Sequence, residues 1–426
     1  MWPFRRNTAA AVRTSQPYWL MRDGIGDARS SARLAPDYDI VIIGAGITGA
    51  LVADSLVATG RRIVMLDSRE PAQGSTSAST ALLQYEIDEH LLDLAKKLGP
   101  ERATLAYRAG VSCFATLEQR FPDLLAQSGY QRRPSLYLAS EQKDVAVLRA
   151  ECAARTGIGI HCEWLEGEDV VRRFGAHRPA AILSSPGAQI DPVRFTRGVL
   201  AGCERHGVEI RTREPVARIE EAGEKLRVLL KSGGSLLAGD VIVCAGYESL
   251  QFLPDGVADL HNTFALVTEP LPPAENVASL PLIWESARPY LYLRGTPDGR
   301  LMVGGADVPL KNAAARDVLL PRQIRRVAAG YQDLFQRELP PIAYAWAGSF
   351  AETRDGLPYI GAVPGLHPRL RFALCYGGNG ISYAIQAGEI LRAGVEGRAH
   401  ALGELYGFGR LGTDLATGRQ RGVAGD

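Results

Sequence analysis

The chain has 426 residues, with 48 Lys and Arg against 47 Asp and Glu, and 46% of its residues are hydrophobic. This length and composition predict two or three structural units with large buried cores. The nearly neutral charge argues against a dedicated nucleic-acid-binding protein, because such proteins normally carry a basic surplus. The six cysteines form no CxxC pair, and no apolar run reaches the roughly 18 residues that span a bilayer. We therefore expect a cytoplasmic protein with no metal site and no transmembrane segment.

The first ordered elements of the chain form a recognisable unit. Residues 1–36 read as an irregular extension, and its aromatic side chains are expected to dock on the main body: Trp2, Phe4, Tyr18 and Trp19. The run 39–43 is short, apolar and β-branched, as in a parallel strand buried on both faces. A glycine-rich turn, a helix over 47–59 and a strand over 62–66 follow. This order predicts a βαβ unit at the start of a doubly wound sheet.

Later segments alternate between helical and strand patterns. Helices are predicted over 141–156, 192–206, 321–336 and 381–395. Strands are predicted over 208–212, 226–231, 240–244, 263–268, 290–294, 300–304 and 371–376. This alternation indicates a nucleotide-binding domain interrupted by insertions that build a second, antiparallel domain. From residue 401 the chain reads as a frayed tail.

A GxGxxG element lies between the first strand and the first helix, and it consists of Gly44, Ala45, Gly46, Ile47, Thr48 and Gly49. Gly44 is expected to make the tight turn, Gly46 to let a pyrophosphate approach, and Gly49 to let the helix pack on the strand. The helix N-terminus then faces the phosphates. Asp67, at the end of the second strand, is placed to accept hydrogen bonds from a ribose. Together these features predict a dinucleotide site.

The fingerprint alone does not choose between FAD and NAD. The small and hydroxyl residues of 74–80 suit a pyrophosphate or a flat ring, although a solvated loop would have the same composition. A second glycine-rich helix start, Gly377–Gly380, follows a predicted strand. Its dipole would favour the negative charge of a reduced flavin ring, and an NAD enzyme has no obvious need for it.

These stretches resemble the D-amino-acid oxidase superfamily, the group of glycine oxidase, sarcosine oxidase and D-amino-acid dehydrogenase. The likeness extends from about residue 37 to 398, and four stretches carry it in family order: 39–49 with Asp67, 74–80, 240–246, and 346–361 with 377–381. The resemblance implies an α/β fold in which an FAD-binding Rossmann-like domain and an antiparallel-sheet substrate domain are interleaved. The implied segments are an extension (1–36), FAD-binding parts (37–130, 183–255 and 346–400), substrate parts (131–182 and 256–345) and a tail (401–426).

The resemblance also implies which residues bind FAD. Pyrophosphate contacts fall to the glycine turn with Ile47 and Thr48, and to Ser75, Thr76 and Ser77. Asp67 binds the ribose, Val216 lies beside the adenine, and Ala245 with Gly246 matches a family turn. Residues near the ribityl chain and ring are Asp355, Gly378, Asn379, Gly380 and Ile381. The segment 74–84 has no histidine, and Gly348 stands at the family's cysteine-bearing position, so we expect FAD to be held without a covalent bond.

The substrate side is predicted from a hairpin around Thr296, Pro297, Asp298 and Gly299. Strand alternation puts Tyr290, Tyr292 and Arg294 on one face, which faces either the flavin pocket or solvent. Many amino-acid-oxidising relatives carry an arginine where this chain has Phe350, and a phenyl ring cannot clamp a carboxylate. Either another arginine replaces it, with Arg294 and Arg288 as the candidates, or the substrate has no carboxylate at that point. We predict Arg294, Tyr292 and Gln84 as the catalytic set.

The predicted function is oxidation of a small amine or amino acid by hydride transfer to flavin N5. One alternative is an FAD-dependent 2-hydroxy-acid dehydrogenase, which would need a base, and His261 is the available candidate. Another is an FAD-binding assembly or interaction protein with little turnover. The oligomeric state stays open.

Overall fold

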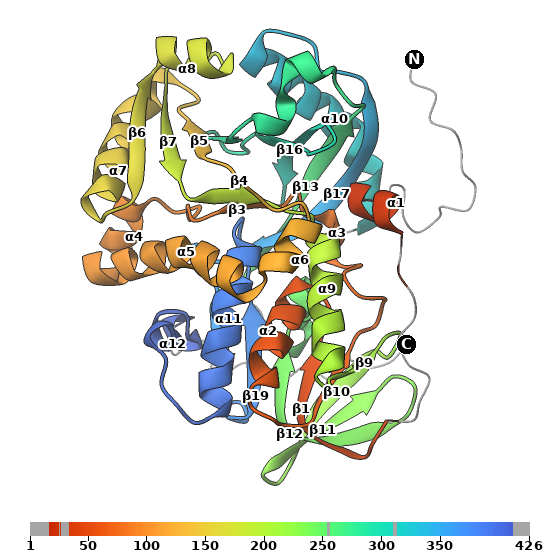
Figure 1. Ribbon diagram of the computed structural model, residues 1–426. Helices are drawn as coiled ribbons and strands as arrows, with labels where there is room; N and C mark the ends of the chain where they lie inside the picture. The colour runs from red at the N-terminus through yellow and green to blue at the C-terminus, as the bar shows by residue number, and fades with distance from the viewer. Residues whose placement is uncertain (1–16, 25, 27–33, 254–255, 310–312, 412–426) are drawn as a thin grey trace.

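The computed structural model describes residues 17–24, 26, 34–253, 256–309 and 313–411. Two eight-stranded sheets form the two halves of the molecule, and a three-stranded sheet lies between them (Figure 1). The helices are α1 (Tyr18–Asp23), α2 (Ile47–Val57), α3 (Ser75–Ala78), α4 (Leu91–Leu98), α5 (Pro100–Arg120), α6 (Pro122–Gln127), α7 (Val145–Gly157), α8 (Gly167–Phe174), α9 (Pro192–Arg205), α10 (Ala313–Phe335), α11 (Gly380–Val395) and α12 (Ala401–Leu405).

The first large sheet has a parallel centre. Its strands are β1 (Asp37–Ile43), β2 (Ile63–Leu66), β9 (Glu209–Arg211), β10 (Val216–Ala222), β11 (Lys225–Leu230), β12 (Ser235–Val243), β18 (Tyr359–Ala362) and β19 (Leu370–Leu374). β1 pairs in parallel with β2 and β12, β2 with β9, and β12 with β19. β10, β11 and β18 pair antiparallel at the margins. The first βαβ unit and the doubly wound arrangement predicted from the sequence are confirmed.

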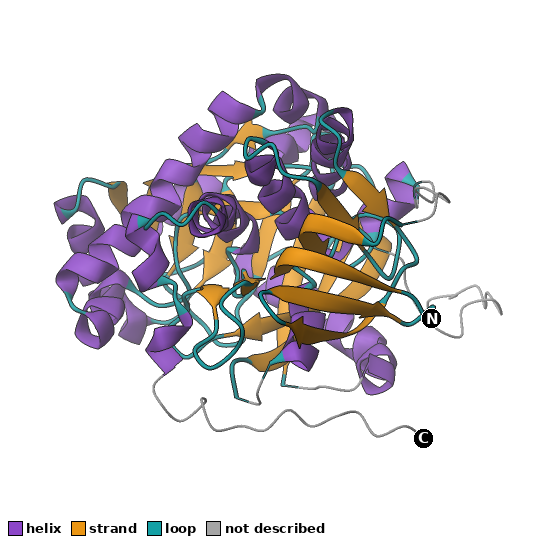
Figure 2. Cartoon of the chain, turned by 90° about the horizontal axis from the view of Figure 1, so that it is seen from below, coloured by secondary structure: helices purple, strands orange, loops and turns teal. Residues whose placement is uncertain are grey.

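Burial on both faces of β1 explains its apolar sequence. Ile40 and Ile42 pack in one core with α2, α9 and α11, whereas Val41 and Ile43 pack in a second core on the opposite face. Figure 1 shows these three helices over one face of the sheet, and Figure 2, from below, shows helices massed beside the strands. The two cores hold the carboxyl ends of β1, β2 and β12 at one edge, where ligands bind in open α/β sheets.

The second large sheet is antiparallel except for one pair. Its strands are β5 (Ser135–Leu138), β6 (His161–Glu166), β7 (Ala180–Ser185), β13 (Asp259–Thr268), β14 (Leu282–Glu285), β15 (Tyr292–Gly295), β16 (Leu301–Val308) and β17 (Ile342–Glu352). β5 and β14 pair in parallel, which the antiparallel prediction did not foresee. The predicted hairpin is present as β15 and β16. α10 covers one face, and the other face turns toward the first sheet.

Strands of the two sheets come from alternating stretches of the chain, so the predicted interleaved α/β fold is confirmed. The exact seven-segment division stays a prediction. The small central sheet contains β3 (Leu82–Gln84), β4 (Gln131–Arg132) and β8 (Gly187–Gln189). Among the described residues, no helix is both long and apolar enough to cross a membrane.

Both predicted ends of the chain need correction. The extension is not irregular throughout, because residues 18–23 form α1 and bury Tyr18, Trp19 and Leu20. Trp2 and Phe4 lie outside the described residues. The start of the predicted tail is folded, because α12 and a following 3-10 turn bury Leu402, Leu405, Tyr406 and Phe408. Apolar anchoring therefore orders residues 401–411 despite their glycine content.

Candidate active site

Two adjoining cavities lie between the large sheets. The larger has a volume of about 690 Å³, and the smaller about 160 Å³. The larger cavity is within the usual range for cofactor and small-molecule sites, which is roughly 300–1,000 Å³. The cavities share lining residues from α3, β17 and the start of α11, among them Ser75, Gly348 and Gly378. A ligand in one would therefore meet a ligand in the other.

The glycine turn after β1 is shaped by close backbone contacts. Gly44 has φ +112°, and a Cβ there would lie 2.4 Å from the carbonyl oxygen of Cys244. A Cβ at Gly49 would lie 1.9 Å from the carbonyl oxygen of Gly44. These two positions let α2 pack against the strand, while Gly46 lines the larger cavity. The three glycines therefore have three different surroundings: Gly44 lies in the turn, Gly49 lies where the helix meets the turn, and Gly46 lies at the cavity.

Polar groups at the start of α2 hold the turn in place. The backbone N–H of Ile47 donates to Thr76 Oγ1 at 3.0 Å. The Asp67 carboxylate accepts from the backbone N–H of Ala45 at 2.6 Å and of Arg69 at 2.8 Å. Burial raises the pKa of Asp67, and these two hydrogen bonds oppose that shift. Asp67 also lines the larger cavity, so it braces the turn and faces the ligand space.

Most predicted cofactor residues lie around the larger cavity: Gly46, Ile47, Thr48, Asp67, Ser75, Thr76, Ser77, Val216, Ala245, Gly246, Gly378, Gly380 and Ile381. Asn379 lines the smaller cavity instead, and its side chain donates to the carbonyl oxygen of Glu86. Asp355 lines neither cavity, contrary to the prediction. Its carboxylate is paired with Arg410 at 2.8 Å, so it fastens the C-terminal segment.

Two of the three predicted catalytic residues reach the smaller cavity. Tyr292 lines it, and its hydroxyl is 3.0 Å from Thr263 Oγ1. Gln84 also lines it, and its Nε2 donates to Ser135 Oγ at 3.0 Å. Arg294 does not line it, so its predicted role in substrate binding is wrong. The side chain is 1% exposed and donates to Thr80 O, Gln189 Oε1, Ile190 O and Gly295 O.

We therefore expect Arg294→Ala to destabilise the protein rather than to weaken substrate binding. Each acceptor left without a donor costs about 1–3 kcal/mol, so the melting temperature should fall by several degrees or more. The KM of the folded, FAD-loaded variant should stay close to that of the parent. Thermal unfolding and steady-state kinetics of the same preparation measure both quantities. A large rise in KM with an unchanged melting temperature would restore the substrate role.

Phe350 lines the smaller cavity, as its place in the sequence suggested, but the candidate base does not. His261 stacks on Phe350 at 5.4 Å and lies 3.6 Å from Glu352, outside both cavities. Arg288 is exposed at the rim, where its guanidinium lies over Tyr290 at 4.8 Å. Of the described residues that line the smaller cavity, none is Lys, Arg or His.

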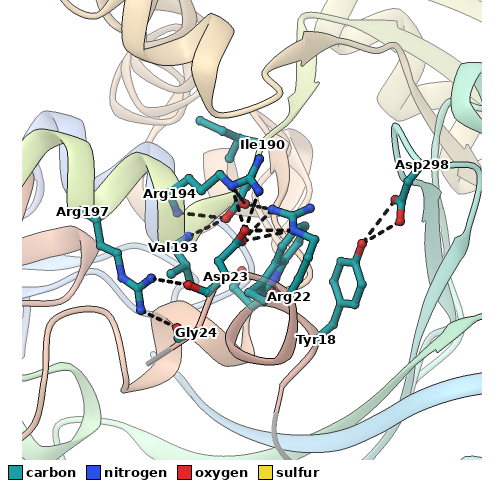
Figure 3. A network of polar contacts seen from close by, with 12 residues as sticks. Tyr18, Arg22, Asp23, Gly24, Ile190, Val193, Arg194, Arg197 and Asp298 are labelled. Carbon is teal, nitrogen blue, oxygen red and sulfur yellow. Dashed lines mark hydrogen bonds and ion pairs between the residues drawn. The ribbon is translucent and has the colours of Figure 1, made fainter. Parts of the chain in front are cut away.

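Sequence reasoning did not assign α1 to the site. Pro17 and Leu20 line the larger cavity, and Trp19 Nε1 donates to the carbonyl oxygen of Ser79 at 2.8 Å. Figure 3 shows Tyr18 pointing toward Asp298 of the hairpin, with its hydroxyl 3.0 Å from Oδ2. α1 therefore joins the loop after α3 to the second sheet. The feature of the sequence that could have indicated this contact is the aromatic pair Tyr18 and Trp19 in the N-terminal extension.

Ion pairs fix the other end of α1. Arg22 contacts Asp191, whose carboxylate caps α9 by accepting from the backbone N–H groups of Val193 and Arg194 (Figure 3). Arg194 in turn binds Asp23 at 2.6 Å. Asp191 and Asp23 therefore hold α1 and α9 together.

This geometry agrees with the relatives of the chain. A family model described as FAD dependent oxidoreductase matches residues 39–393. The chain belongs to this family. A probable oxidoreductase OrdL of Haemophilus influenzae is 21% identical over 89% of both chains. A glycine oxidase of Bacillus licheniformis is 25% identical over 83% of this chain and 92% of its own length.

Solved structures show the same fold. A glycine oxidase from Geobacillus kaustophilus has a TM-score of 0.68 at 18% identity and covers 86% of this chain and 96% of its own. An L-proline dehydrogenase from P. horikoshii has a TM-score of 0.70 at 17% identity, covering 89% of this chain and 98% of its own. The family match begins at residue 39, so α1 lies outside it.

The larger cavity fits the FAD on which this family depends. Gly46, the residue before α2, has no side chain and lines the cavity, and the N-terminus of a helix favours a pyrophosphate. Asp67 and Val216 line the same space at the strand ends. The start of α11 lies where the two cavities meet, which suits a ring that faces both.

Proposed function

We propose that this FAD-dependent oxidoreductase oxidises a small amine bound in the smaller cavity. The main observation in support is that this cavity adjoins the cofactor cavity and shares lining residues with it. Aromatic residues, including Trp284, Tyr290 and Tyr292, line the smaller cavity. The bound FAD supplies the hydride acceptor, and the substrate carbon next to nitrogen loses the hydride. The nitrogen loses a proton to water, and the resulting imine hydrolyses to a carbonyl compound.

The residues of the cavity favour an amine over a 2-hydroxy acid. His261, the base named for the 2-hydroxy-acid alternative, lies outside the cavity, and the acids that line it, Glu86, Asp88 and Asp307, would repel the carboxylate of a 2-hydroxy acid. A neutral amine needs no such base. The interaction-protein alternative rested partly on the aromatic extension, and two of those aromatics, Tyr18 and Trp19, are buried on the chain itself.

The chain's own groups orient the substrate. Gln84 is held by Ser135, which also accepts from Trp284 Nε1 at 3.1 Å. Thr263 holds Tyr292, whose ring packs against Gly304. These contacts fix the aromatic wall, so the substrate carbon can be held beside the cofactor while water is displaced.

An anaerobic titration tests the proposal. The FAD-loaded protein is mixed with amines, amino acids and 2-hydroxy acids, and its visible spectrum is followed. Bleaching by amines and not by 2-hydroxy acids is the expected result. Bleaching by 2-hydroxy acids alone would contradict it.

We also propose that FAD is held without a covalent bond. Cys244 and Cys375 line the larger cavity, and burial raises the pKa of Cys375 to about 12 and that of Cys244 well above its usual range. Because the thiolate is the reactive form, neither thiol is a ready nucleophile. Acid precipitation should therefore leave the yellow colour in the supernatant. Colour that stays with the precipitate would overturn this proposal.

A further inference from the structure

The smaller cavity is acidic as well as aromatic. Three carboxylates line it, from Glu86, Asp88 and Asp307, and no cationic side chain of the described chain does. Aromatic faces attract cations through their π electrons, and carboxylates attract them directly. A cavity of this kind repels a carboxylate-bearing ligand. The acidic side chains therefore favour a positively charged substrate over one that carries a carboxylate.

Asp307 is turned into the cavity by an irregularity in β16. Between Phe264 and Asn262 of β13, the paired residue shifts from Gly305 to Val308, so β16 has one extra residue that bulges out of the ladder. Ala306, next to Asp307, has φ +56°, which is unusual for a residue with a side chain. Bulges next to active sites re-aim side chains. Asp307 Oδ1 is buried and has no hydrogen-bond partner among the described residues.

Glu86 provides a second unsatisfied oxygen. Glu86 is among the residues that line the cavity, but its side chain is only 1% exposed. Oε1 accepts from Ser184 Oγ at 2.7 Å and lies 3.8 Å from Arg155 Nη1. Oε2 is buried and has no hydrogen-bond partner within the described chain. The Glu86 carboxylate is therefore a buried negative charge beside the cavity rather than a surface that a ligand touches.

Asp88, the third acid, is already engaged. Its Oδ2 accepts from the backbone N–H of Gly378 at 3.0 Å, and its Oδ1 from the Tyr290 hydroxyl at 3.4 Å. Asp88 therefore contributes negative charge to the cavity, but both of its carboxylate oxygens already accept hydrogen bonds. Of the three acids, Asp307 is therefore the one that is only partly buried and that still has an oxygen without a partner among the described residues.

We propose that the smaller cavity selects an amine that carries a second, positively charged group, and that Asp307 receives that group while Glu86 and Asp88 add negative charge around it. This inference rests on the proposed amine oxidation and names its substrate class. The second group stays protonated while the reacting nitrogen becomes neutral. An amine with a carboxylate at that end meets like charge, and none of the described residues that line the cavity is cationic.

The electrostatic surroundings of Asp307 make the selection depend on pH. Burial, with smaller contributions from nearby Glu352 and Asp88, raises the pKa of Asp307 to about 6, whereas Thr263 and His261 oppose the shift. The Tyr290 and Tyr292 hydroxyls also face this carboxyl. Below about pH 6 the carboxyl gains a proton, so it attracts a cation less strongly.

Three compounds with the same four-carbon chain test the proposal: putrescine, n-butylamine and γ-aminobutyrate. Each is titrated anaerobically into the FAD-loaded protein, with calorimetry for binding and the visible spectrum for reduction. Putrescine should bind roughly tenfold or more tighter than n-butylamine, and γ-aminobutyrate should bind most weakly. The preference for putrescine should weaken as the pH falls through about 6.

Asp307→Asn keeps the shape of the side chain and removes its charge, so it should abolish most of the preference and its pH dependence. Glu352→Gln removes a charge near Asp307 but outside both cavities, and it should keep the preference. The flavin spectrum and melting temperature confirm that each variant is folded and loaded.

The outcomes separate this inference from the proposed function. Equal binding of putrescine and n-butylamine, tightest binding of γ-aminobutyrate, or equal effects of the two variants would overturn the charge selection. Bleaching by γ-aminobutyrate would do so while leaving amine oxidation intact. Tight binding of putrescine without bleaching by any amine would instead uphold the charge selection and contradict the proposed reaction.

Discussion

Replacing Trp19 with alanine is expected to destabilise the protein and to release FAD. Trp19 is 1% exposed, and removing a buried Trp side chain costs about 3–5 kcal/mol. Its indole N–H also holds the carbonyl oxygen of Ser79, in the loop that lines both cavities. Without that bond and without the packing of α1, the loop loses its support on one side. Thermal unfolding and the ratio of FAD to protein after gel filtration measure the two effects.

Met21→Ala is the matched control, because Met21 lies on the same helix and is 53% exposed. Its effect on stability should stay within about 0.5 kcal/mol. If Trp19→Ala kept both the melting temperature and the full FAD content of the parent, α1 would contribute neither to stability nor to the cofactor site.

Gly49→Ala is expected to prevent assembly of the folded, FAD-loaded protein. The added Cβ would stand 1.9 Å from the carbonyl oxygen of Gly44, and the backbone on both sides belongs to the packed turn and α2. Neither can move without opening the turn beside the cofactor cavity. Soluble yield, the flavin absorbance and the melting temperature report the loss.

Gly157→Ala provides the control for this change. Gly157 also lies in a helix, α7, and a Cβ there meets no atom within 4 Å. Alanine is favoured over glycine in helices by about 1 kcal/mol, so this variant should be as stable as the parent or more so. A Gly49→Ala protein that folds and binds FAD normally would show that the contact between α2 and the turn relaxes easily.

The sequence predicted those parts of the site whose chemistry is local. Gly44 and Gly49 mark the turn because a Cβ at either position would clash with a backbone oxygen, and the apolar run of β1 predicts a strand buried on both faces. Arg294 was misplaced because strand alternation gives the face of a side chain, but not how far the cavity extends along that face. Beyond Tyr292 the face is covered by Trp19 of α1, over whose ring the Arg294 guanidinium lies at 5.4 Å.

Asp307 and Asp355 show what depends on tertiary structure. The pair Gly304 and Gly305 before Asp307 was the available signal of a bulge, because glycines within a strand often mark one. Asp355 resembled a family position near the flavin, but Arg410, from a segment read as a frayed tail, binds it. The pairing of Asp355 with Arg410 does not follow from a local pattern in the sequence.

The central claim is that this chain uses FAD to oxidise an amine in the cavity beside the cofactor. The most direct measurement is the anaerobic visible spectrum of the purified FAD-loaded protein during addition of small amines, with 2-hydroxy acids in parallel. The account predicts that the flavin band bleaches with amines and persists with 2-hydroxy acids. A band that no amine bleaches, at concentrations where calorimetry shows the amine bound, would contradict it.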